Sequence, residues 1–275
     1  MPAQPTLTLN TGQSMPQLGF GVFKVPLDET AKAVSDALHV GYRSIDTAAM
    51  YRNEEGVGQA IADSGIARDE LFITTKLNND AHGYDNALRA FEQSRQRLGL
   101  EYLDLYLIHW PLPAQDDYVE TWKALEQLHR DGVARSVGVS NFQPAHLQRL
   151  LDECDLVPAV NQIELHPYLV QDELRRFDAQ HDIVTEAWSP IARGGALLQD
   201  RVIATLAEKY ARTPAQIVIR WHLQLGNLVI PKSVTPARIA ENFDVFDFEL
   251  ADDDVAEITA LDRDQRTGPH PDQMN

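Results

Sequence analysis

Leu71-Phe72-Ile73-Thr74-Thr75-Lys76, followed after a longer segment by Leu103-Asp104-Leu105-Tyr106-Leu107-Ile108, is the stretch of sequence that decides the fold. Both runs are short, mostly apolar and rich in residues that favour β-strands, and a helical pattern from Tyr84 to Leu98 separates them. Strands joined through a helix of this length run parallel. The stretch is therefore predicted to be one β-α-β unit with buried strands.

The same alternation extends outward to both ends of the chain. The other predicted strands are Gly19–Val22, Arg43–Asp46, Ser136–Val139, Ala159–Ile163, Ile183–Ala187 and Leu228–Ile230. The other predicted helices are Asp28–His39, Asn53–Ser64, Asp117–Arg130, Pro144–Glu153, Asp172–Gln180, Arg201–Tyr210, Pro214–Leu225 and a last helix from Pro236. Eight strands that alternate with helices in 275 residues predict a fold of the α/β class, a single-domain (β/α)8 TIM barrel over residues 1–275.

Two glycine-containing segments near the N-terminus refine this prediction. Thr6–Gly12 followed by Met15–Leu18 is typical of a β-hairpin, which we expect to cap the floor of the barrel. Gly19–Lys24 lacks the third glycine of a dinucleotide-binding turn, and no helix begins there, so an open doubly wound sheet is disfavoured.

Charge and cysteine content exclude several classes of function. The chain has 24 Lys and Arg against 41 Asp and Glu, a net charge of −17, which would repel nucleic acids and anionic membranes. No apolar run approaches the ~18 residues of a membrane span, and the N-terminus lacks a signal-peptide pattern, so we expect a soluble cytoplasmic protein. The single cysteine, Cys154, excludes an intrachain disulfide, and its acidic surroundings argue against a nucleophilic thiolate.

Polar residues follow the second, third and fourth predicted strands, at the end of the barrel where active sites lie. They are Asp46 with Tyr51 five residues later, then Lys76, then His109. A phenol with a pKa near ~10 is a weak acid at neutral pH, but a nearby ammonium stabilises the phenolate and lowers that pKa. We therefore expect Lys76, held by Asp46, to make Tyr51 a proton donor.

Several motifs together resemble those of the aldo-keto reductases. They are Asp46-Thr47-Ala48-Ala49-Met50-Tyr51, Thr75-Lys76-Leu77, Ile108-His109-Trp110-Pro111, Gly138-Val139-Ser140-Asn141-Phe142, Asn161-Gln162-Ile163-Glu164 and Ile230-Pro231-Lys232-Ser233. The resemblance implies an NADPH-dependent oxidoreductase that reduces aldehydes and ketones by hydride transfer. It implies that Tyr51 is the general acid, assisted by Lys76 and Asp46, and that His109 orients the substrate carbonyl. No metal is implied.

The resemblance also implies a set of residues that hold NADPH. Ser140, Asn141 and Gln162 would bind the nicotinamide carboxamide, Trp188 would stack on the ring, and Ser189 would lie along the pyrophosphate. Lys232, Ser233 and Arg238, around a helix that begins at Pro236, would bind the 2′-phosphate, with Glu241 and Asn242 near the adenine.

Within the family, the chain is most similar to bacterial 2,5-diketo-D-gluconate reductases. This likeness implies small polar substrates such as dicarbonyls and keto-sugar acids, and usually a monomer. Phe23 and Trp110 would line the substrate pocket, but Asn78 stands where those relatives usually have tryptophan. Two other readings, a non-catalytic NADPH sensor and a lyase that forms a Schiff base at Lys76, leave part of the motif set without a role.

Overall fold

Eight parallel strands form the centre of the molecule in the computed structural model, which describes residues 4–274. Their order is β10-β9-β8-β7-β6-β5-β4-β3, so neighbours in sequence are neighbours in the sheet. The strands are β3 (Phe20–Gly21), β4 (Ser44–Asp46), β5 (Phe72–Leu77), β6 (Leu103–Ile108), β7 (Ala134–Ser140), β8 (Val160–Glu164), β9 (Val184–Trp188) and β10 (Leu228–Val229).

The two ends of this sheet meet and close it into a barrel. Leu18, just before β3, forms a parallel bridge with Val229 of β10. The amide of Gly19 donates to the Val229 carbonyl at 2.8 Å, and the amide of Val229 donates to the Gln17 carbonyl at 2.9 Å. Together with the similar solved structures described below, this closure confirms the predicted TIM barrel.

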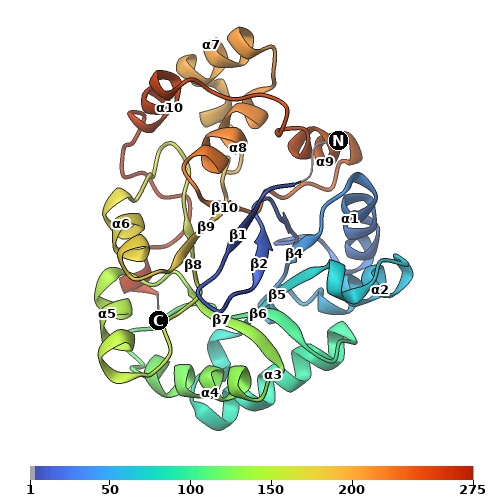
Figure 1. Cartoon of the computed structure of the whole chain (residues 1–275), viewed down its shortest axis with the longest axis vertical. Coiled ribbons are helices and arrows are strands. Elements are labelled where there is room, and N and C mark those ends of the chain that lie inside the picture. Colours follow the sequence, from blue (N-terminus) through green and yellow to red (C-terminus); the bar gives the residue numbers. More distant parts are fainter. Residues whose placement is uncertain (1–3, 275) are drawn as a thin grey trace.

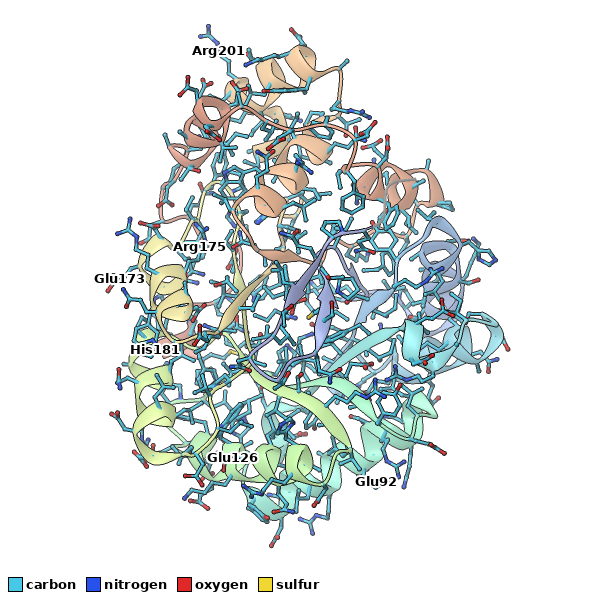
Figure 2. The ribbon with its side chains drawn as sticks, viewed as in Figure 1. Glu92, Glu126, Glu173, Arg175, His181 and Arg201 are labelled. Atoms are coloured by element: carbon cyan, nitrogen blue, oxygen red, sulfur yellow. The ribbon has the colours of Figure 1, made fainter. Side chains whose placement is uncertain are left out.

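Helices surround the barrel on its outer side (Figure 1). They are α1 (Leu27–Val40), α2 (Glu54–Asp63), α3 (Tyr84–Leu98), α4 (Tyr118–Arg130), α5 (Pro144–Glu153), α6 (Asp172–Gln180), α7 (Arg201–Tyr210), α8 (Pro214–Gln224), α9 (Pro236–Phe243) and α10 (Asp252–Thr259). Side chains fill the space between strands and helices, while charged residues such as Glu173 and Arg201 lie on the outer surface (Figure 2). No helix in the described range 4–274 is both long and apolar enough to cross a membrane.

The predicted N-terminal hairpin covers one end of the barrel. Strands β1 (Thr6–Thr8) and β2 (Ser14–Pro16) pair in antiparallel fashion, and they lie across the ring of strands in Figure 1. Leu9 and Met15 are buried in a cluster that includes Phe72, the first residue of β5, and Leu228, the first of β10. Because these residues begin their strands, the hairpin caps the amino-terminal floor, as expected.

The helix that begins at Pro236 is not the last one, which corrects the sequence analysis. Helix α10 follows it, with three aspartates in its first turn that favour a helix N-terminus. Its apolar face is short, since only Val255 and Ile258 point towards the core, so its periodicity is weak. Lys209 of α7 binds Asp254 at 2.7 Å and holds α10 against the barrel.

Candidate active site

The four residues predicted to carry the chemistry lie together at the carboxyl ends of neighbouring strands. Asp46 is the last residue of β4, Lys76 is the next to last of β5, and His109 directly follows β6. Tyr51 ends the short 3-10 helix η1 (Ala49–Tyr51), which turns the chain back over the mouth. Parallel pairing of β4, β5 and β6 therefore brings these side chains together.

Lys76 is fully buried and held by two acceptors. Its Nζ lies 2.6 Å from Oδ1 of Asp46 and 2.9 Å from the carbonyl oxygen of Thr47. Burial alone would lower the pKa of Lys76, but Asp46, Tyr51 and Glu186 outweigh it and raise this pKa above the ordinary value. The surroundings of Lys76 therefore favour the charged ammonium and hold it in place.

Tyr51 is half-buried between aromatic rings and this ammonium. Its ring centre is 5.7 Å from that of His109 and 5.0 Å from that of Phe23, and Nζ of Lys76 is 5.2 Å from it. Burial raises the pKa of Tyr51, whereas Lys76 lowers it through its charge and a hydrogen bond. The net effect raises the pKa of Tyr51, which corrects the expectation that Lys76 brings this pKa below its usual value. Lys76 does lower the pKa, but burial raises it by more.

His109 is held in its neutral form. Burial and the charge of Lys76 keep the pKa of this imidazole well below its ordinary value. Within residues 4–274 its Nδ1 has no hydrogen-bond partner, while its backbone carbonyl accepts from Nδ2 of Asn141 at 2.9 Å. A neutral imidazole has one N–H to donate to a carbonyl oxygen.

The three residues predicted to hold a carboxamide are buried and connected beside this tetrad. Asn141 adopts a left-handed conformation with φ 64°, immediately after β7. Its Oδ1 accepts from the indole Nε1 of Trp188 at 2.8 Å. Ser140 donates from its hydroxyl to the backbone carbonyl of Gln162 at 2.8 Å. The predicted stacking residue Trp188, half-buried at the end of β9 and followed by the half-buried Ser189, is thus tied to the predicted carboxamide site.

Gln162 connects the tetrad to a further carboxyl group. Its Nε2 donates to Oδ2 of Asp46 and to Oε2 of Glu186, both at 2.8 Å. Two carboxyl oxygens as neighbours require the NH₂ end of the amide to face them. Only Oε1 of Gln162 remains for a ligand, as an acceptor for an amide N–H.

The basic segment after β10 is exposed and ready to receive an anion. Lys232 and Arg238 are exposed, and neither has an ion pair among the described residues. Pro236 occupies the first turn of α9, as predicted. Thr235 stands at the N-cap, but its side chain makes no cap hydrogen bond; instead Oγ of Ser233 accepts from the Thr235 amide at 3.1 Å. The remaining amides of the first turn are free for an anion.

The two residues predicted near an adenine are placed differently from each other. Glu241 accepts a hydrogen bond from the Thr213 hydroxyl at 2.8 Å. Asn242 is only 5% exposed and lies with Ile239 and Phe243 on the buried face of α9.

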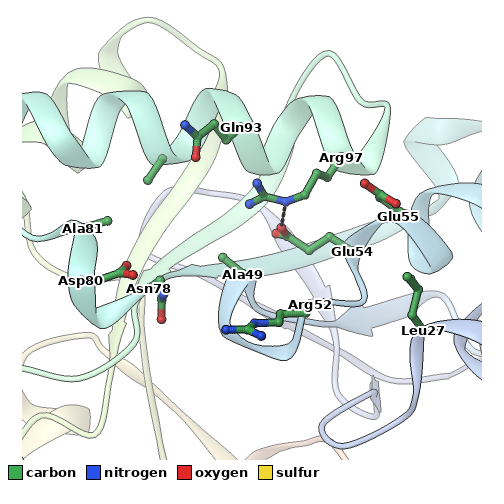
Figure 3. A pocket seen from close by; sticks show the side chains of 11 residues that line it. Leu27, Ala49, Arg52, Glu54, Glu55, Asn78, Asp80, Ala81, Gln93 and Arg97 are labelled. Atoms are coloured by element: carbon green, nitrogen blue, oxygen red, sulfur yellow. Dashed lines mark hydrogen bonds and ion pairs between the residues drawn. The ribbon is translucent and has the colours of Figure 1, made fainter.

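The three predicted substrate residues are not all placed at the tetrad: Phe23 contacts Tyr51, whereas Asn78 faces a neighbouring cleft. Phe23 is 45% exposed and Trp110 is 7% exposed. Asn78 is half-buried after β5, and its Oδ1 accepts from the amide of Asn79, which caps the short helix η3 (Asn79–Ala81). Asn78 also lines a cleft of about 400 Å³ with Arg52 and Gln93 (Figure 3). Tyr51 is not among the residues that line this cleft, so Asn78 faces it from the outer side of η1.

Comparison with known proteins matches this arrangement to one family. The sequence profile of the Aldo/keto reductase family matches residues 17–263. The chain belongs to the aldo/keto reductase family.

Individual members of the family are similar over almost the full length. An aldo-keto reductase of Mycolicibacterium smegmatis is 56% identical over 271 residues and covers 98% of both chains. The methylglyoxal reductase DkgA of Escherichia coli K12 is 55% identical over 274 residues, 99% of both chains. Among solved structures, Gox0644 in its apo form has a TM-score of 0.94 at 53% identity over 98% of both chains. A variant of Gox0644 in complex with NADPH has a TM-score of 0.95 at 52% identity over 99% of both chains.

Two buried acids of this aldo-keto reductase escaped the sequence analysis. Glu186 lies inside the barrel next to Gln162, and Glu164 lies at the end of β8. Both are 0% exposed. A signal was available for Glu186, a carboxylate within the predicted buried strand Ile183–Ala187, where an acid needs a specific partner. Glu164 directly follows the predicted strand Ala159–Ile163, which in the structure extends one residue further.

Glu164 anchors the C-terminal segment of the chain. Its Oε1 accepts from the amide and hydroxyl of Thr267, both at 2.5 Å, and its Oε2 accepts from the amide of Gly268 at 3.0 Å. A Cβ atom on Gly268 would lie 2.6 Å from Cη2 of Trp188. The C-terminal segment therefore packs directly against the indole edge.

Other reactive groups are separate from this site. Burial and Glu126 raise the pKa of Cys154 to about 11, so its thiolate is disfavoured, as predicted from its acidic surroundings. Among the described residues, no group of three or more His, Cys, Asp or Glu side chains is arranged to hold a metal ion.

Proposed function

We propose that this chain is an NADPH-dependent reductase of small carbonyl compounds in which Tyr51 donates the proton. The observation that carries the proposal is the buried Asp46–Lys76 pair, 2.6 Å apart, beside Tyr51 and a neutral His109. Such a pair holds a positive charge next to a phenol, where it stabilises the phenolate that forms as the proton leaves.

The cofactor part of the proposal rests on the fit of the polar groups at the mouth. Oε1 of Gln162 is left free to accept from a carboxamide N–H. The indole of Trp188 is linked to the same group of residues by its hydrogen bond to Asn141. Lys232 and Arg238 are exposed and suit a 2′-phosphate. When bound, NADPH supplies the hydride. The similar structure of the Gox0644 variant in complex with NADPH supports this assignment.

The protein's own residues manage the carbonyl oxygen. We assign Tyr51 as the donor of the proton to that oxygen, so that the hydroxyl O–H bond breaks as the alcohol O–H bond forms. Burial raises the pKa of Tyr51, which keeps the phenol protonated at neutral pH until transfer. The positive charge of Lys76 then stabilises the phenolate, and the single N–H of His109 orients the carbonyl oxygen.

For the substrate, we propose small polar 1,2-dicarbonyls and keto-sugar acids such as 2,5-diketo-D-gluconate. Relatives named methylglyoxal reductase support the dicarbonyl class. Asn78 enters the proposal as an amide two residues after Lys76 that can donate to a hydroxyl or carbonyl group, whereas an indole would offer area to an apolar ring. Because Asn78 lines the cleft on the outer side of η1, its part in selectivity is what the variant below tests.

The test compares kcat/KM with NADPH for methylglyoxal, 2,5-diketogluconate and a bulky aromatic ketone. We expect the two polar substrates to be preferred in the wild type, and Asn78→Trp to shift preference towards the aromatic ketone. Asn78→Ala is the control, because it also loses the cap of η3 without adding a ring. A wild type that prefers the aromatic ketone, with an unchanged ranking in Asn78→Trp, would overturn the substrate class. No consumption of NADPH with any carbonyl would overturn the function itself.

A further inference from the structure

Glu186 is a buried carboxyl group inside the barrel that the proposed reaction does not yet use. It is 0% exposed and stands on β9, in register with Gln162 of β8 and Leu228 of β10. Its Oε2 receives a hydrogen bond from Nε2 of Gln162 at 2.8 Å. Within the described residues its Oε1 has no partner at all.

Among residues 4–274, Lys76 is the one cation whose charge acts on Glu186. Asp46 approaches from β4, Lys76 from β5, Tyr51 from η1 and Gln162 from β8. Lys76 is already paired with Asp46 at 2.6 Å. A second buried carboxylate with an unpaired oxygen would be costly, so the surroundings favour the neutral acid.

The same surroundings place the ionisation of Glu186 in an accessible pH range. Burial, together with the negative charge of Asp46, raises the pKa of Glu186 to about 8, and Gln162 and Lys76 offset only part of this effect. At neutral pH the protonated form of Glu186 therefore predominates.

We propose that Glu186 is a positioning residue for the proton transfer: it holds the Gln162 amide against Asp46, and loss of its own proton slows the reduction at alkaline pH. The inference rests on the proposed function and names a group that controls it. The charge of an ionised Glu186 acts on Tyr51 in one direction, because it raises the pKa of the phenol. A phenol of higher pKa is a weaker acid towards the carbonyl oxygen, so kcat/KM falls when Glu186 ionises.

The first experiment is the pH profile of kcat/KM for methylglyoxal with saturating NADPH. For the wild type we expect a fall as the pH rises through about 8. Glu186→Gln has the same shape and no charge at any pH. The kcat/KM of this variant should match that of the wild type within about threefold at acidic pH. The pH at which its kcat/KM falls should be higher by about one unit or more. Identical profiles for the two proteins would overturn the proposal.

Asp178→Asn is the matched control. Asp178 is also a buried acid beside β9: it accepts from the hydroxyl of Thr185 at 2.9 Å, and burial raises its pKa to about 7. It lies on α6, and within residues 4–274 the hydrogen-bond partners of its side chain are Asn161 and Thr185, neither of which belongs to the tetrad. The control should keep the wild-type profile, and a shift equal to that of Glu186→Gln would contradict a specific role for Glu186.

A second measurement covers the case in which Glu186→Gln does not fold. Infrared spectroscopy of Asp178→Asn, with NADP bound, follows the band of protonated buried carboxyl groups without the contribution of Asp178. We expect a band that disappears as the pH rises through about 8. A carboxyl group that is already ionised at about pH 6 would overturn the proposal. Because this measurement needs no turnover, it still decides about Glu186 if the chain reduces no carbonyl compound.

Discussion

At Tyr51, two opposing effects act on the pKa of a single residue, and burial is the larger of them. Burial raises its pKa, whereas Lys76 lowers it from one side of the ring. The phenol therefore stays protonated without a ligand, and the ammonium acts mainly when charge develops on the oxygen. On the proposed mechanism, we therefore expect Lys76 to stabilise the transition state more than the resting state.

This balance predicts the behaviour of Tyr51→Phe. The substitution removes the hydroxyl that we propose as the proton donor but leaves the ring between Phe23 and His109. We expect kcat to fall by about 10²–10⁴-fold while the Kd for NADPH changes by less than about threefold. Steady-state kinetics and a fluorescence titration check both values. The control is Tyr84→Phe, an exposed tyrosine on α3 that should behave as wild type. A loss below about tenfold would exclude Tyr51 as the general acid.

The positions of the site residues were predictable from the sequence, but their electrostatics were not. Asp46, Lys76 and His109 could be located because polar residues at strand ends meet at one mouth of a parallel barrel. The upward shift of the Tyr51 pKa depends on how much water η1 excludes, and no local pattern encodes that. The bridge from Gln162 to Glu186 joins two strands, and it likewise needed the register between them.

At the scale of elements, the start of α9 presents charge to a ligand without using it in the fold. Lys232 is exposed four residues before the helix, and Arg238 is exposed within its first turn. A chain of net charge −17 repels a phosphate in general, so affinity for one must come from such a local cluster.

Replacing both residues, Lys232→Ala with Arg238→Ala, should therefore remove the preference for NADPH. Each charged hydrogen bond contributes about 1.5–3 kcal/mol, so we expect NADPH binding to weaken by about 10²-fold or more while NADH binding changes little. The control is Lys32→Ala with Arg176→Ala, which changes the net charge equally on α1 and α6. Isothermal titration with both cofactors checks this. Equal affinities for NADPH and NADH in the wild type would refute the assignment.

The C-terminal segment should position Trp188. In Gly268→Val the new side chain meets Cη2 of Trp188, 2.6 Å from the Cβ position, and displaces the indole. We expect NADPH to bind about tenfold more weakly and to quench less tryptophan fluorescence. Thr267→Ser is the control, because it keeps the hydroxyl that donates to Glu164. Unchanged binding and quenching in Gly268→Val would show that the segment does not support Trp188.

Elements were predictable where their periodicity was long. Most of the helices have buried faces of several residues, whereas α10 has only Val255 and Ile258 and α6 only Leu174 and Phe177 as apolar residues towards the core. Helix α6 was still predictable, because it stands between two predicted strands, whereas α10 follows the last one. The path of the C-terminal segment could not be predicted, because it depends on a hydrogen bond between residues about a hundred positions apart, such as Gly268 and Glu164.

At the scale of the whole molecule, the barrel is held shut by a contact between its two ends. Gln17 is 6% exposed, and its Nε2 donates to the carbonyl oxygens of Leu223 at 2.8 Å and Asn227 at 3.1 Å. These carbonyls lie at the end of α8 and just before β10. The side chain thus fastens the N-terminal segment to the last strand.

Gln17→Ala should destabilise the closed barrel without touching the site. It leaves two buried carbonyl groups without this donor, so we expect the free energy of unfolding to fall by about 1–3 kcal/mol. Urea unfolding followed by fluorescence measures the change, and the slope of the transition should stay constant. Gln13→Ala, a half-buried position in the hairpin loop, is the control and should stay within about 0.5 kcal/mol. Equal effects of the two substitutions would show that Gln17 does not fasten the barrel.

The contact between Gln17 and Asn227 also implies a delay during synthesis of the chain. These partners are 210 residues apart, and at about 5–20 residues per second a ribosome needs about 10–40 s to deliver the second after the first. During that interval the strand that begins at Phe20 has a bare edge on one side, open to any other strand it meets. The risk of aggregation through this strand edge is therefore highest during synthesis, before β10 has been made. A holding chaperone that binds its first residues would act within that interval.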